Sequence, residues 1–551
     1  MRWSRRGRRS GLDELSVRIK FWSYDTSRLD VWEEYSVGPS RVYIGEGDGE
    51  PRYVVVDPPL TEEELAYLSA VARKLVFILP REALKSREEF YRELREAGVR
   101  DEKLLYYLDR EVRGFSSLDP LMRDPNLENI ECGLANTPVL VVHRTYGRME
   151  TNLVYSEEEL DELVVRLAHM AGRSVSTFKP KIDSAVLPGG HRLALTYRSE
   201  VSPTSGFTIR KFPEKPWTIA KMLANKMITP EAAAWLWLLI ESRLAVIVFG
   251  AMGSGKTSLV NALMNLIPPD AMVGTVEDVA EFKIAHKYWV RLVAREAETI
   301  GGVGEITLAS LLAHALRRNL DYVVVNEVRF EEARVWAQAI ALGHGGLTTI
   351  HAESPELVFA RLRDLGVTPS LLQALHGMVW TWFYRTRRGG RLVRLRRVKA
   401  VYDIELDGDN TVLKPLFSYS IEKDTLEYGE NELLSCRSAE IMMEANGWSD
   451  EELIHEWRRR TDFLRKLRDV VAKNPRLAEL DTLSVIIRDF YRRIPLRRRP
   501  PERVARVQQS FGLEEVRYCP SCGRRLPVPN LTFCPFCGKR LRGEVFARLE
   551  G

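Results

Sequence analysis

Short apolar runs alternate with amphipathic stretches through the middle of the chain. Residues 244–249 are rich in valine and isoleucine, and the length and composition of this run predict a buried strand. Residues 258–267 follow with the spacing of a helix, and two prolines end that pattern. The alternation continues from residue 218 to about residue 430. It predicts a doubly wound parallel α/β sheet for this part of the chain.

The flanking regions have other patterns. Residues 116–211 combine short predicted strands with an amphipathic helix at 156–171, which Ser156 is placed to cap. Residues 378–384 and 392–401 are separated by two glycines and predict a hairpin at the edge of the central domain. We therefore expect a second α/β module before the central sheet.

A glycine-rich segment joins the first predicted strand of the central domain to its helix. Gly250-Ala-Met-Gly-Ser-Gly-Lys256-Thr257 fills every fixed position of the phosphate-loop pattern G-x-x-x-x-G-K-[ST]. Glycines let backbone N–H groups surround a phosphate, and the helix N-terminus adds positive potential. The alternative is a plain glycine turn, which the complete match and its flanks disfavour. The predicted nucleotide-binding residues are Gly250, Gly253, Ser254, Gly255, Lys256, Thr257 and Ser258, with Thr257 also holding Mg²⁺.

Carboxylates follow two other predicted strands. Glu327 lies just beyond the apolar run 322–325, and Glu277 and Asp278 follow the run 272–276. Ligands of open α/β sheets bind at the carboxyl ends of the strands, so catalytic groups gather at that edge. Glu327 is therefore predicted to orient or activate the attacking water, and Glu277 to approach the metal or the same water. A surface carboxylate at a strand end is the alternative for Glu327.

Two histidines lie in a third polar segment, Gly343-His-Gly-Gly-Leu-Thr-Thr-Ile-His351. Its glycines permit close approach of the backbone. The imidazoles of His344 and His351 are candidates for contact with a γ-phosphate or with a neighbouring subunit. Two histidines at this spacing are more often structural than catalytic, so the residues alone leave their role open.

Composition narrows the class of protein. The 551 residues are 45% hydrophobic and 28% charged, which is typical of a globular protein of several domains. The net charge of +5 excludes a strong polyanion binder. Arginines cluster near both ends, in runs suited to acidic lipid, to nucleic acid or simply to solvent. Cys132 and Cys436 are expected to be small core residues.

Membrane and targeting segments are not expected. No apolar run approaches the roughly 18 residues that a membrane helix needs. The basic N-terminus is followed by no apolar core, unlike a signal peptide. We therefore expect a cytoplasmic protein whose association with a membrane is peripheral.

Four further cysteines form two CPxCG knuckles near the C-terminus. Their thiolates suit tetrahedral Zn²⁺ in a closed structural site, and a reducing cytosol disfavours the alternative of disulfides. The segment is too short to fold on its own core, so bound metal would stabilise it. The predicted zinc ligands are Cys519, Cys522, Cys534 and Cys537.

Four segments occur in the order found in one family of motors: the phosphate loop and residues 275–278, 323–329 and 343–352. With them the chain resembles the type II/type IV secretion ATPase superfamily, which includes pilus-assembly, archaellum and type II secretion motors. In that family the last three segments are the aspartate box, the Walker B segment and the histidine box. Residues 207–212 resemble its junction between N-terminal and motor domains, and residues 118–125 resemble its archaeal branch.

The resemblance covers roughly residues 115–430. It implies a hexameric ring of RecA-like P-loop NTPase domains that use ATP and Mg²⁺ to displace a polytopic inner-membrane platform protein. Together, the residue patterns and the resemblance predict an N-terminal α/β region (1–115), a PAS-like domain (116–211), a linker (212–217), a RecA-like ATPase domain (218–430), a helical C-terminal region (431–495), a basic linker (496–517) and a zinc ribbon (518–545).

The resemblance also assigns roles by position. Lys256 and Thr257 bind phosphate and Mg²⁺, and Glu327 is the Walker B glutamate. The aspartate-box acids are Glu277 and Asp278, and the histidine-box residues that sense the γ-phosphate are His344 and His351. Arg210 lies where the family places a nucleotide-proximal arginine. Arg192 and Arg198 are alternatives for an arginine that reaches across a subunit boundary and stabilises charge on the transferring phosphoryl group.

Asn326 stands where the family usually has glycine, and Phe330 where glycine or aspartate usually follows the arginine. Neither departure removes a catalytic group. The predicted function is a hexameric ATPase motor that drives assembly of a type IV pilus-like filament or protein secretion at the cytoplasmic membrane.

Two other functions are weighed against this one. A nucleic-acid-translocating RecA-like ATPase would need stimulation by DNA or RNA, and the sequence contains no aromatic-rich basic groove of the stacking kind, so no specific nucleic acid is expected. A nucleotide-binding assembly scaffold with little turnover is the second alternative, and the intact Glu327 argues against it.

Overall fold

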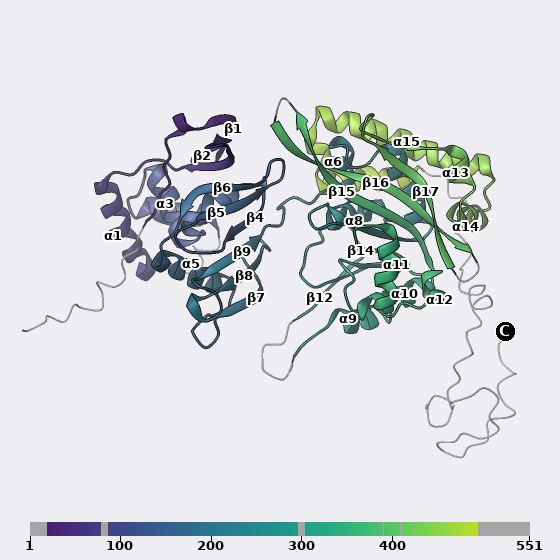
Figure 1. Ribbon diagram of the computed structural model, residues 1–551, viewed down its shortest axis with the longest axis horizontal. Coiled ribbons are helices and arrows are strands. Elements are labelled where there is room, and N and C mark those ends of the chain that lie inside the picture. The colour runs from purple at the N-terminus through teal and green to yellow at the C-terminus, as the bar shows by residue number, and fades with distance from the viewer. Residues whose placement is uncertain (1–18, 79–85, 296–303, 389–390, 408–409, 494–551) are drawn as a thin grey trace, which may run out of the picture. The chain divides into compact units, whose positions relative to one another are not determined.

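The computed structural model describes residues 19–78, 86–295, 304–388, 391–407 and 410–493. Contacts divide these residues into two compact units. Unit 1 holds the described residues of Met1–Lys215 and Phe383–Leu395, and unit 2 holds those of Pro216–Trp382 and Arg396–Gly551. The described residues build a nine-stranded sheet for each unit, with helices beside it (Figure 1), which confirms the predicted mixed α/β class.

The first sheet has the strand order β1-β2-β3-β6-β5-β4-β9-β8-β7. Its neighbours are antiparallel except β3 and β6, which run parallel. The strands are β1 (Asp30–Val37), β2 (Ser40–Gly47), β3 (Glu50–Val56), β4 (Leu127–Cys132), β5 (Pro138–His143), β6 (Gly147–Val154), β7 (Lys181–Val186), β8 (Arg192–Thr196) and β9 (Gly206–Arg210). The helices of this unit are α1 (Glu62–Ile78), α2 (Arg87–Glu96), α3 (Glu102–Val112), α4 (Asp119–Arg123) and α5 (Glu157–Met170).

Helix α5 packs on the first sheet through one apolar face. Ser156 begins it with a capping box, in which the Ser156 hydroxyl accepts from the Glu159 N–H and the Glu159 carboxylate accepts from the Ser156 N–H. Leu160, Val164 and Leu167 recur at helical spacing, and all three are fully buried. The helix predicted around this cap is therefore confirmed.

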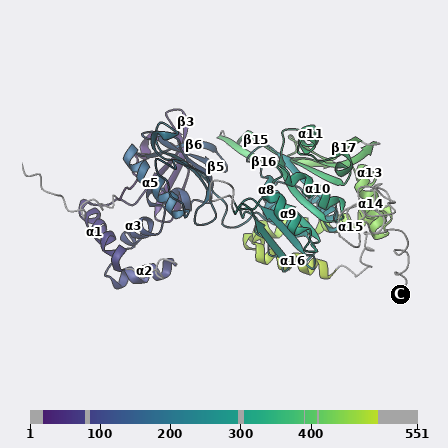
Figure 2. The same ribbon diagram turned by 90° about the horizontal axis from the view of Figure 1, so that it is seen from below.

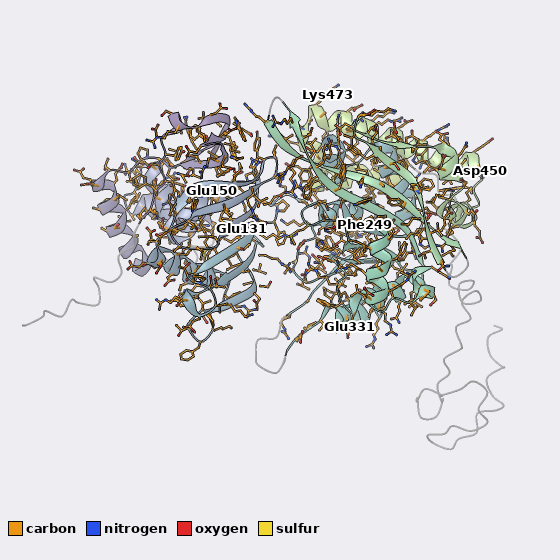
Figure 3. The ribbon with its side chains drawn as sticks, in the orientation of Figure 1. Glu131, Glu150, Phe249, Glu331, Asp450 and Lys473 are labelled. Atoms are coloured by element: carbon orange, nitrogen blue, oxygen red, sulfur yellow. The ribbon has the colours of Figure 1, made fainter. Side chains whose placement is uncertain are left out.

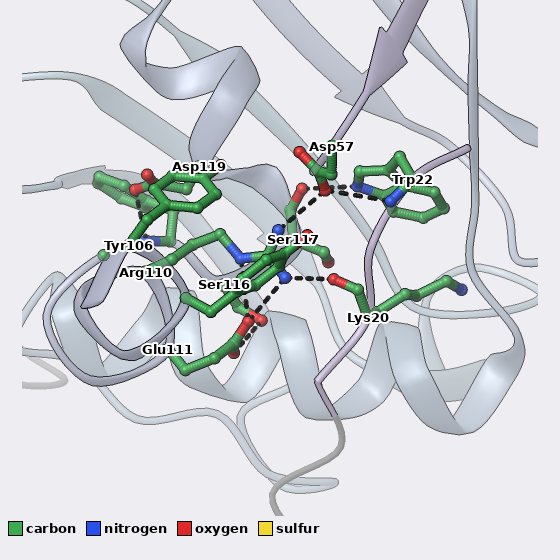
Figure 4. A network of polar contacts seen from close by, with 12 residues as sticks. Lys20, Trp22, Asp57, Tyr106, Arg110, Glu111, Ser116, Ser117 and Asp119 are labelled. Carbon is green, nitrogen blue, oxygen red and sulfur yellow. Dashed lines mark hydrogen bonds and ion pairs between the residues drawn. The ribbon is translucent and has the colours of Figure 1, made fainter. Parts of the chain in front are cut away.

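Helices α1, α2 and α3 pack together beside the same sheet (Figure 2). Arg110 of α3 joins them to it, because its buried guanidinium donates to Asp57 Oδ2 at 3.0 Å, to Glu111 Oε1 at 3.1 Å and to the carbonyl of Lys20 (Figure 4). Asp57 also accepts the backbone N–H of Trp22 at 3.0 Å. A buried charge is tolerated only when it is paired, and this network ties α3 to Lys20, Trp22 and Asp57.

The second sheet has the order β12-β11-β13-β14-β10-β15-β16-β17-β18. Strands β12, β11, β13, β14, β10 and β15 are parallel, whereas β16, β17 and β18 continue the sheet in antiparallel fashion. The strands are β10 (Ala245–Gly250), β11 (Val273–Glu277), β12 (Trp289–Val293), β13 (Tyr322–Val325), β14 (Gly345–His351), β15 (Leu375–Arg388), β16 (Arg391–Asp407), β17 (Asn410–Ser420) and β18 (Thr425–Tyr428).

The hairpin of β15 and β16 lies inside this sheet. The expectation that it forms the edge of the domain was wrong, because β10 pairs with β15 and β17 pairs with β16. Periodicity identifies strands but not their neighbours, and the pairing of β15 with β10 joins residues about 130 positions apart in the chain.

Helices flank the second sheet, and the longest, α15, runs between Asp450 and Lys473 (Figure 3). The helices are α6 (Ile219–Ala224), α7 (Pro230–Glu241), α8 (Lys256–Leu263), α9 (Leu308–Ala315), α10 (Glu332–Ala341), α11 (Pro355–Asp364), α12 (Pro369–Leu372), α13 (Glu430–Leu434), α14 (Arg437–Asn446), α15 (Asp450–Lys473) and α16 (Leu480–Arg492). The apolar residues of α7 pack against α15 in the largest core.

Two further expectations concern the cysteines and membrane-spanning segments. Cys132 and Cys436 are buried with free thiols, in agreement with their predicted place in the core. Among the helices that the structure describes, none is both long enough and apolar enough to cross a membrane.

Candidate nucleotide site

The phosphate loop leaves β10 at Gly250 and enters α8 at Lys256. Gly250 has φ of +148°, and a Cβ there would lie 2.0 Å from the carbonyl oxygen of Thr381 on the neighbouring strand β15. Gly255 has φ of +96° at the N-cap of α8. Both positions therefore require glycine. Ser254 is fully buried, and its hydroxyl lies 2.8 Å from Thr381 Oγ1, which anchors the loop to the sheet.

The backbone N–H groups in the first turn of α8 point toward the loop. Thr257 and Ser258 lie in this turn and are partly exposed. The first N–H groups of a helix have no intrahelical acceptor, so they favour an anion. Gly253 completes the loop with φ of +73°, and its carbonyl accepts the Nε–H of Arg396 at 2.8 Å.

Lys256 is buried, and its ammonium is held by polar atoms of the loop and of β14. Its Nζ donates to the carbonyls of Gly250 at 3.0 Å and Ala251 at 3.1 Å, and lies 3.0 Å from His351 Nδ1. The loop carbonyls thus hold the ammonium beside the end of β14. A phosphate bound by the loop would compete for the same ammonium.

His351 connects this lysine to Glu327. His351 Nε2 lies 3.2 Å from Glu327 Oε1, and the imidazole satisfies both contacts when its proton is on Nε2 and Nδ1 accepts from the lysine. Burial, followed by the positive charge of Lys256, lowers the pKa of His351 and favours this neutral form. Glu327 also binds Arg329, whose guanidinium lies 2.5 Å from Glu327 Oε2.

Asp278 completes a cluster at the carboxyl ends of β11 and β13. The side-chain amide of Asn326 donates to Asp278 Oδ1, and a guanidinium nitrogen of Arg329 lies 4.0 Å from Asp278 Oδ2. Two carboxylates, one guanidinium and one carboxamide therefore gather beside the phosphate loop. Carboxylate oxygens and the Thr257 hydroxyl are the donors that Mg²⁺ prefers, so these residues fit a divalent cation carried by a nucleotide.

Glu277 is placed differently from Asp278. Its side chain is fully buried and accepts the backbone N–H groups of Glu281 and Phe282, both at 2.7 Å. The Thr275 hydroxyl donates to it at 3.0 Å, and Arg291 lies 3.3 Å away. Burial raises the pKa of Glu277. These contacts hold the segment after β11 in shape and occupy both oxygens of the carboxylate.

The two histidines of the predicted box lie at opposite ends of β14. His351 ends the strand beside Lys256, whereas His344 precedes it and lies 2.7 Å from the Leu320 carbonyl through Nδ1. At ~3.3 Å per strand residue the two are roughly 20 Å apart. His344 therefore does not reach a phosphate bound by the loop of its own chain. The predicted contact of His344 with a γ-phosphate does not hold for a nucleotide in that loop.

Two groups of predicted residues lie outside the described part of unit 2. Arg210 ends β9 in unit 1, whereas the phosphate loop is in unit 2. Cys519, Cys522, Cys534 and Cys537 lie outside the described residues.

Three polar residues of the site were not predicted from the sequence. Arg329 lies in a recognised segment, and its charge two residues after Glu327 was a usable signal. Thr381 and Arg396 come from β15 and β16, and no local pattern marks them as neighbours of the loop. Only the pairing of β15 with β10 brings them there.

A buried lysine after a glycine loop, a helix N-terminus and strand-end carboxylates together define a phosphate-loop nucleotide-binding protein. The model of the family "Type II/IV secretion system protein" matches residues 158–380. An uncharacterized protein of Methanocaldococcus jannaschii is 31% identical over 431 residues, which cover 71% of this chain and 77% of that protein.

A putative conjugal transfer protein of Mycobacterium tuberculosis is 33% identical over 284 residues, covering 50% of this chain and 80% of that protein. The VirB11 ATPase of the Brucella suis type IV secretion system aligns structurally with a TM-score of 0.26 and 25% identity, over 52% of this chain and 95% of that one. The chain belongs to the type II/IV secretion ATPase superfamily.

Proposed function

We propose that the protein hydrolyses ATP and uses the energy as a motor at a membrane-associated secretion or pilus system. The observation that carries the proposal is the continuous contact from Lys256 through His351 to Glu327. It links the group that would bind the β- and γ-phosphates to the carboxylate that would orient the attacking water. Such a link lets the arrival of a γ-phosphate change the environment of the hydrolytic carboxylate.

The residues of the site would each take one task. Lys256 would exchange two backbone carbonyls for phosphate oxygens, and Thr257 would place its hydroxyl on Mg²⁺. Mg²⁺ neutralises charge on the phosphates when bound. Glu327 would then exchange Arg329 for the attacking water, and Asp278 would hold a water or the metal.

Coupling to mechanical work belongs to the same proposal. Family membership supports a homo-hexamer that acts on a polytopic inner-membrane platform protein, with peripheral association to the cytoplasmic membrane. Arg210 is proposed to approach a nucleotide held by another subunit, which would make hydrolysis depend on the ring. The four C-terminal cysteines are proposed to hold a structural Zn²⁺ that serves docking.

The test is ATP turnover and nucleotide affinity in two variants. Lys256→Ala is expected to lose both, because the phosphates lose their buried cation. Glu327→Gln is expected to bind a fluorescent ATP analogue with nearly unchanged affinity while turnover falls by about 10²- to 10⁴-fold. The matched controls are Lys287→Ala and Glu331→Gln, which change exposed residues of the same unit.

Three outcomes would contradict the proposal. Unchanged turnover in Lys256→Ala would exclude hydrolysis at this site, and brisk turnover in Glu327→Gln would remove the role of the carboxylate. Stimulation by single-stranded DNA or RNA would favour a nucleic-acid motor. Measuring the molar mass of the assembly in solution, with ATP present, tests whether the protein forms a hexamer.

A further inference from the structure

Asn326 is the last residue before the proposed hydrolytic glutamate, and its backbone is fixed on both sides. Its N–H donates to the Val276 carbonyl on β11 at 3.2 Å, and its carbonyl accepts the Thr349 hydroxyl on β14 at 2.6 Å. The residue is 4% exposed. Its side chain is therefore held between the two strands that flank β13, at the edge where Asp278 and Glu327 gather.

The orientation of the Asn326 carboxamide follows from its contact with Asp278. Its Nδ2 faces Asp278 Oδ1, and only the N–H side can face a carboxylate favourably. The carboxamide oxygen Oδ1 must then point away from Asp278. Among the residues that the structure describes, this oxygen is buried and accepts no hydrogen bond.

A buried acceptor without a donor costs free energy, so such oxygens in native proteins ordinarily have a partner. Atoms of the chain cover Asn326 Oδ1 here, so a partner reaches it only when a neighbouring side chain moves. The proposed function already requires a rearrangement of side chains at this edge of the sheet, because Glu327 must leave Arg329 to act on water. The missing donor is therefore expected to arrive with the nucleotide.

We propose that Asn326 is an added outer ligand of the nucleotide-bound divalent cation, with Oδ1 accepting a hydrogen bond from a water molecule on that cation. The Asn326 amide meanwhile keeps its hydrogen bond to Asp278 Oδ1. Removing a group that hydrogen-bonds to a ligand of a cation typically weakens binding of that cation by about tenfold or more. This inference rests on the proposed nucleotide site and adds to it a residue that the family pattern does not contain.

The test measures cation affinity separately from catalysis. Mn²⁺ binding is titrated by electron paramagnetic resonance on the full-length protein, with a non-hydrolysable ATP analogue present. Asn326→Leu keeps the branching at Cγ and removes both polar atoms, and it is expected to weaken Mn²⁺ binding by about tenfold. Asn326→Asp restores an acceptor oxygen and is expected to recover the affinity, although a second carboxylate beside Asp278 lowers the thermal stability of the metal-free protein.

Thr348→Val is the matched control. Thr348 lies on β14, and its buried hydroxyl also accepts and donates no hydrogen bond among the described residues. Removing that hydroxyl is expected to leave Mn²⁺ affinity unchanged. It therefore separates loss of a cation ligand from the general effect of altering a buried polar group on this sheet.

The results distinguish the two proposals. If the wild-type protein binds no ATP analogue with Mn²⁺, the proposed function itself fails. If the wild type binds both but Asn326→Leu does so with equal Mn²⁺ affinity, only the role of Asn326 is refuted. A loss in Asn326→Leu that Asn326→Asp fails to recover would also refute it, since a structural role needs no acceptor oxygen.

Discussion

Gly250→Ala tests the geometry of the phosphate loop directly. The added Cβ would lie 2.0 Å from the Thr381 carbonyl oxygen and 2.8 Å from its hydroxyl oxygen. A comfortable contact is about 3.4 Å or longer, so loop and strand must separate by more than about 1 Å. The left-handed φ of +148° adds backbone strain of about 1–3 kcal/mol, and forced overpacking adds about 1–3 kcal/mol more.

We therefore expect Gly250→Ala to lower the free energy of unfolding by about 2–6 kcal/mol. A displacement of about 1 Å in a catalytic site costs on the order of 10²-fold in rate, so ATP turnover should fall at least that far. The assays are denaturant unfolding followed by tryptophan fluorescence, and phosphate release under saturating ATP. Gly343 provides the control, because its φ is +96° but a Cβ there meets nothing within 4 Å.

Gly343→Ala should lose only the backbone contribution, about 1–2 kcal/mol, and should retain turnover. If Gly250→Ala matches Gly343→Ala in both stability and turnover, the close approach of the loop to Thr381 does not constrain the site. That result would refute the reasoning from steric contact.

Three other predictions concern stability and metal content. Burial lowers the pKa of His143 to about 4, so below about pH 6.5 the unfolded chain takes up a proton that the native state does not accept until about pH 4. The free energy of unfolding should therefore fall by up to about 3 kcal/mol as the pH drops from about 6.5 to about 4. Melting temperature measured against pH should fall less steeply in His143→Asn. Arg110→Met removes the guanidinium that pairs with the buried Asp57 carboxylate, so the free energy of unfolding should fall by about 3–5 kcal/mol. Adding Asp57→Asn in the double variant should restore part of this loss. An unchanged melting temperature in Arg110→Met would contradict the prediction. Metal analysis should find one zinc per chain, lost in Cys519→Ser with ATP turnover retained, and a chain without zinc would refute the predicted ribbon.

Local pattern was sufficient wherever a function depends on consecutive residues. The phosphate loop, its strand and its helix were all predicted from residues 244–267, because the glycines and the lysine act within one turn of backbone. Ser156 likewise marked the start of α5 through a cap that involves only its own first turn. Such features need no knowledge of the remaining chain.

The roles of the carboxylates and histidines could not be separated in this way. Glu277 and Asp278 are adjacent in sequence, but Glu277 is the last residue of β11 and is buried in backbone hydrogen bonds, whereas Asp278 follows the strand and joins the cluster. His344 and His351 share one segment, yet β14 runs between them and leaves only His351 beside Lys256.

The sequence by itself determined the α/β class, the phosphate loop and the family, because these depend on short-range spacing and composition. Tertiary structure decided which polar groups meet. The parallel pairing of β10 with β14 and β15 brings His351 and Thr381 to the loop from about 100 residues or more away in the chain, and the pairing of β11 with β13 sets Asn326 against Asp278. Strand order is a long-range property that local periodicity does not encode.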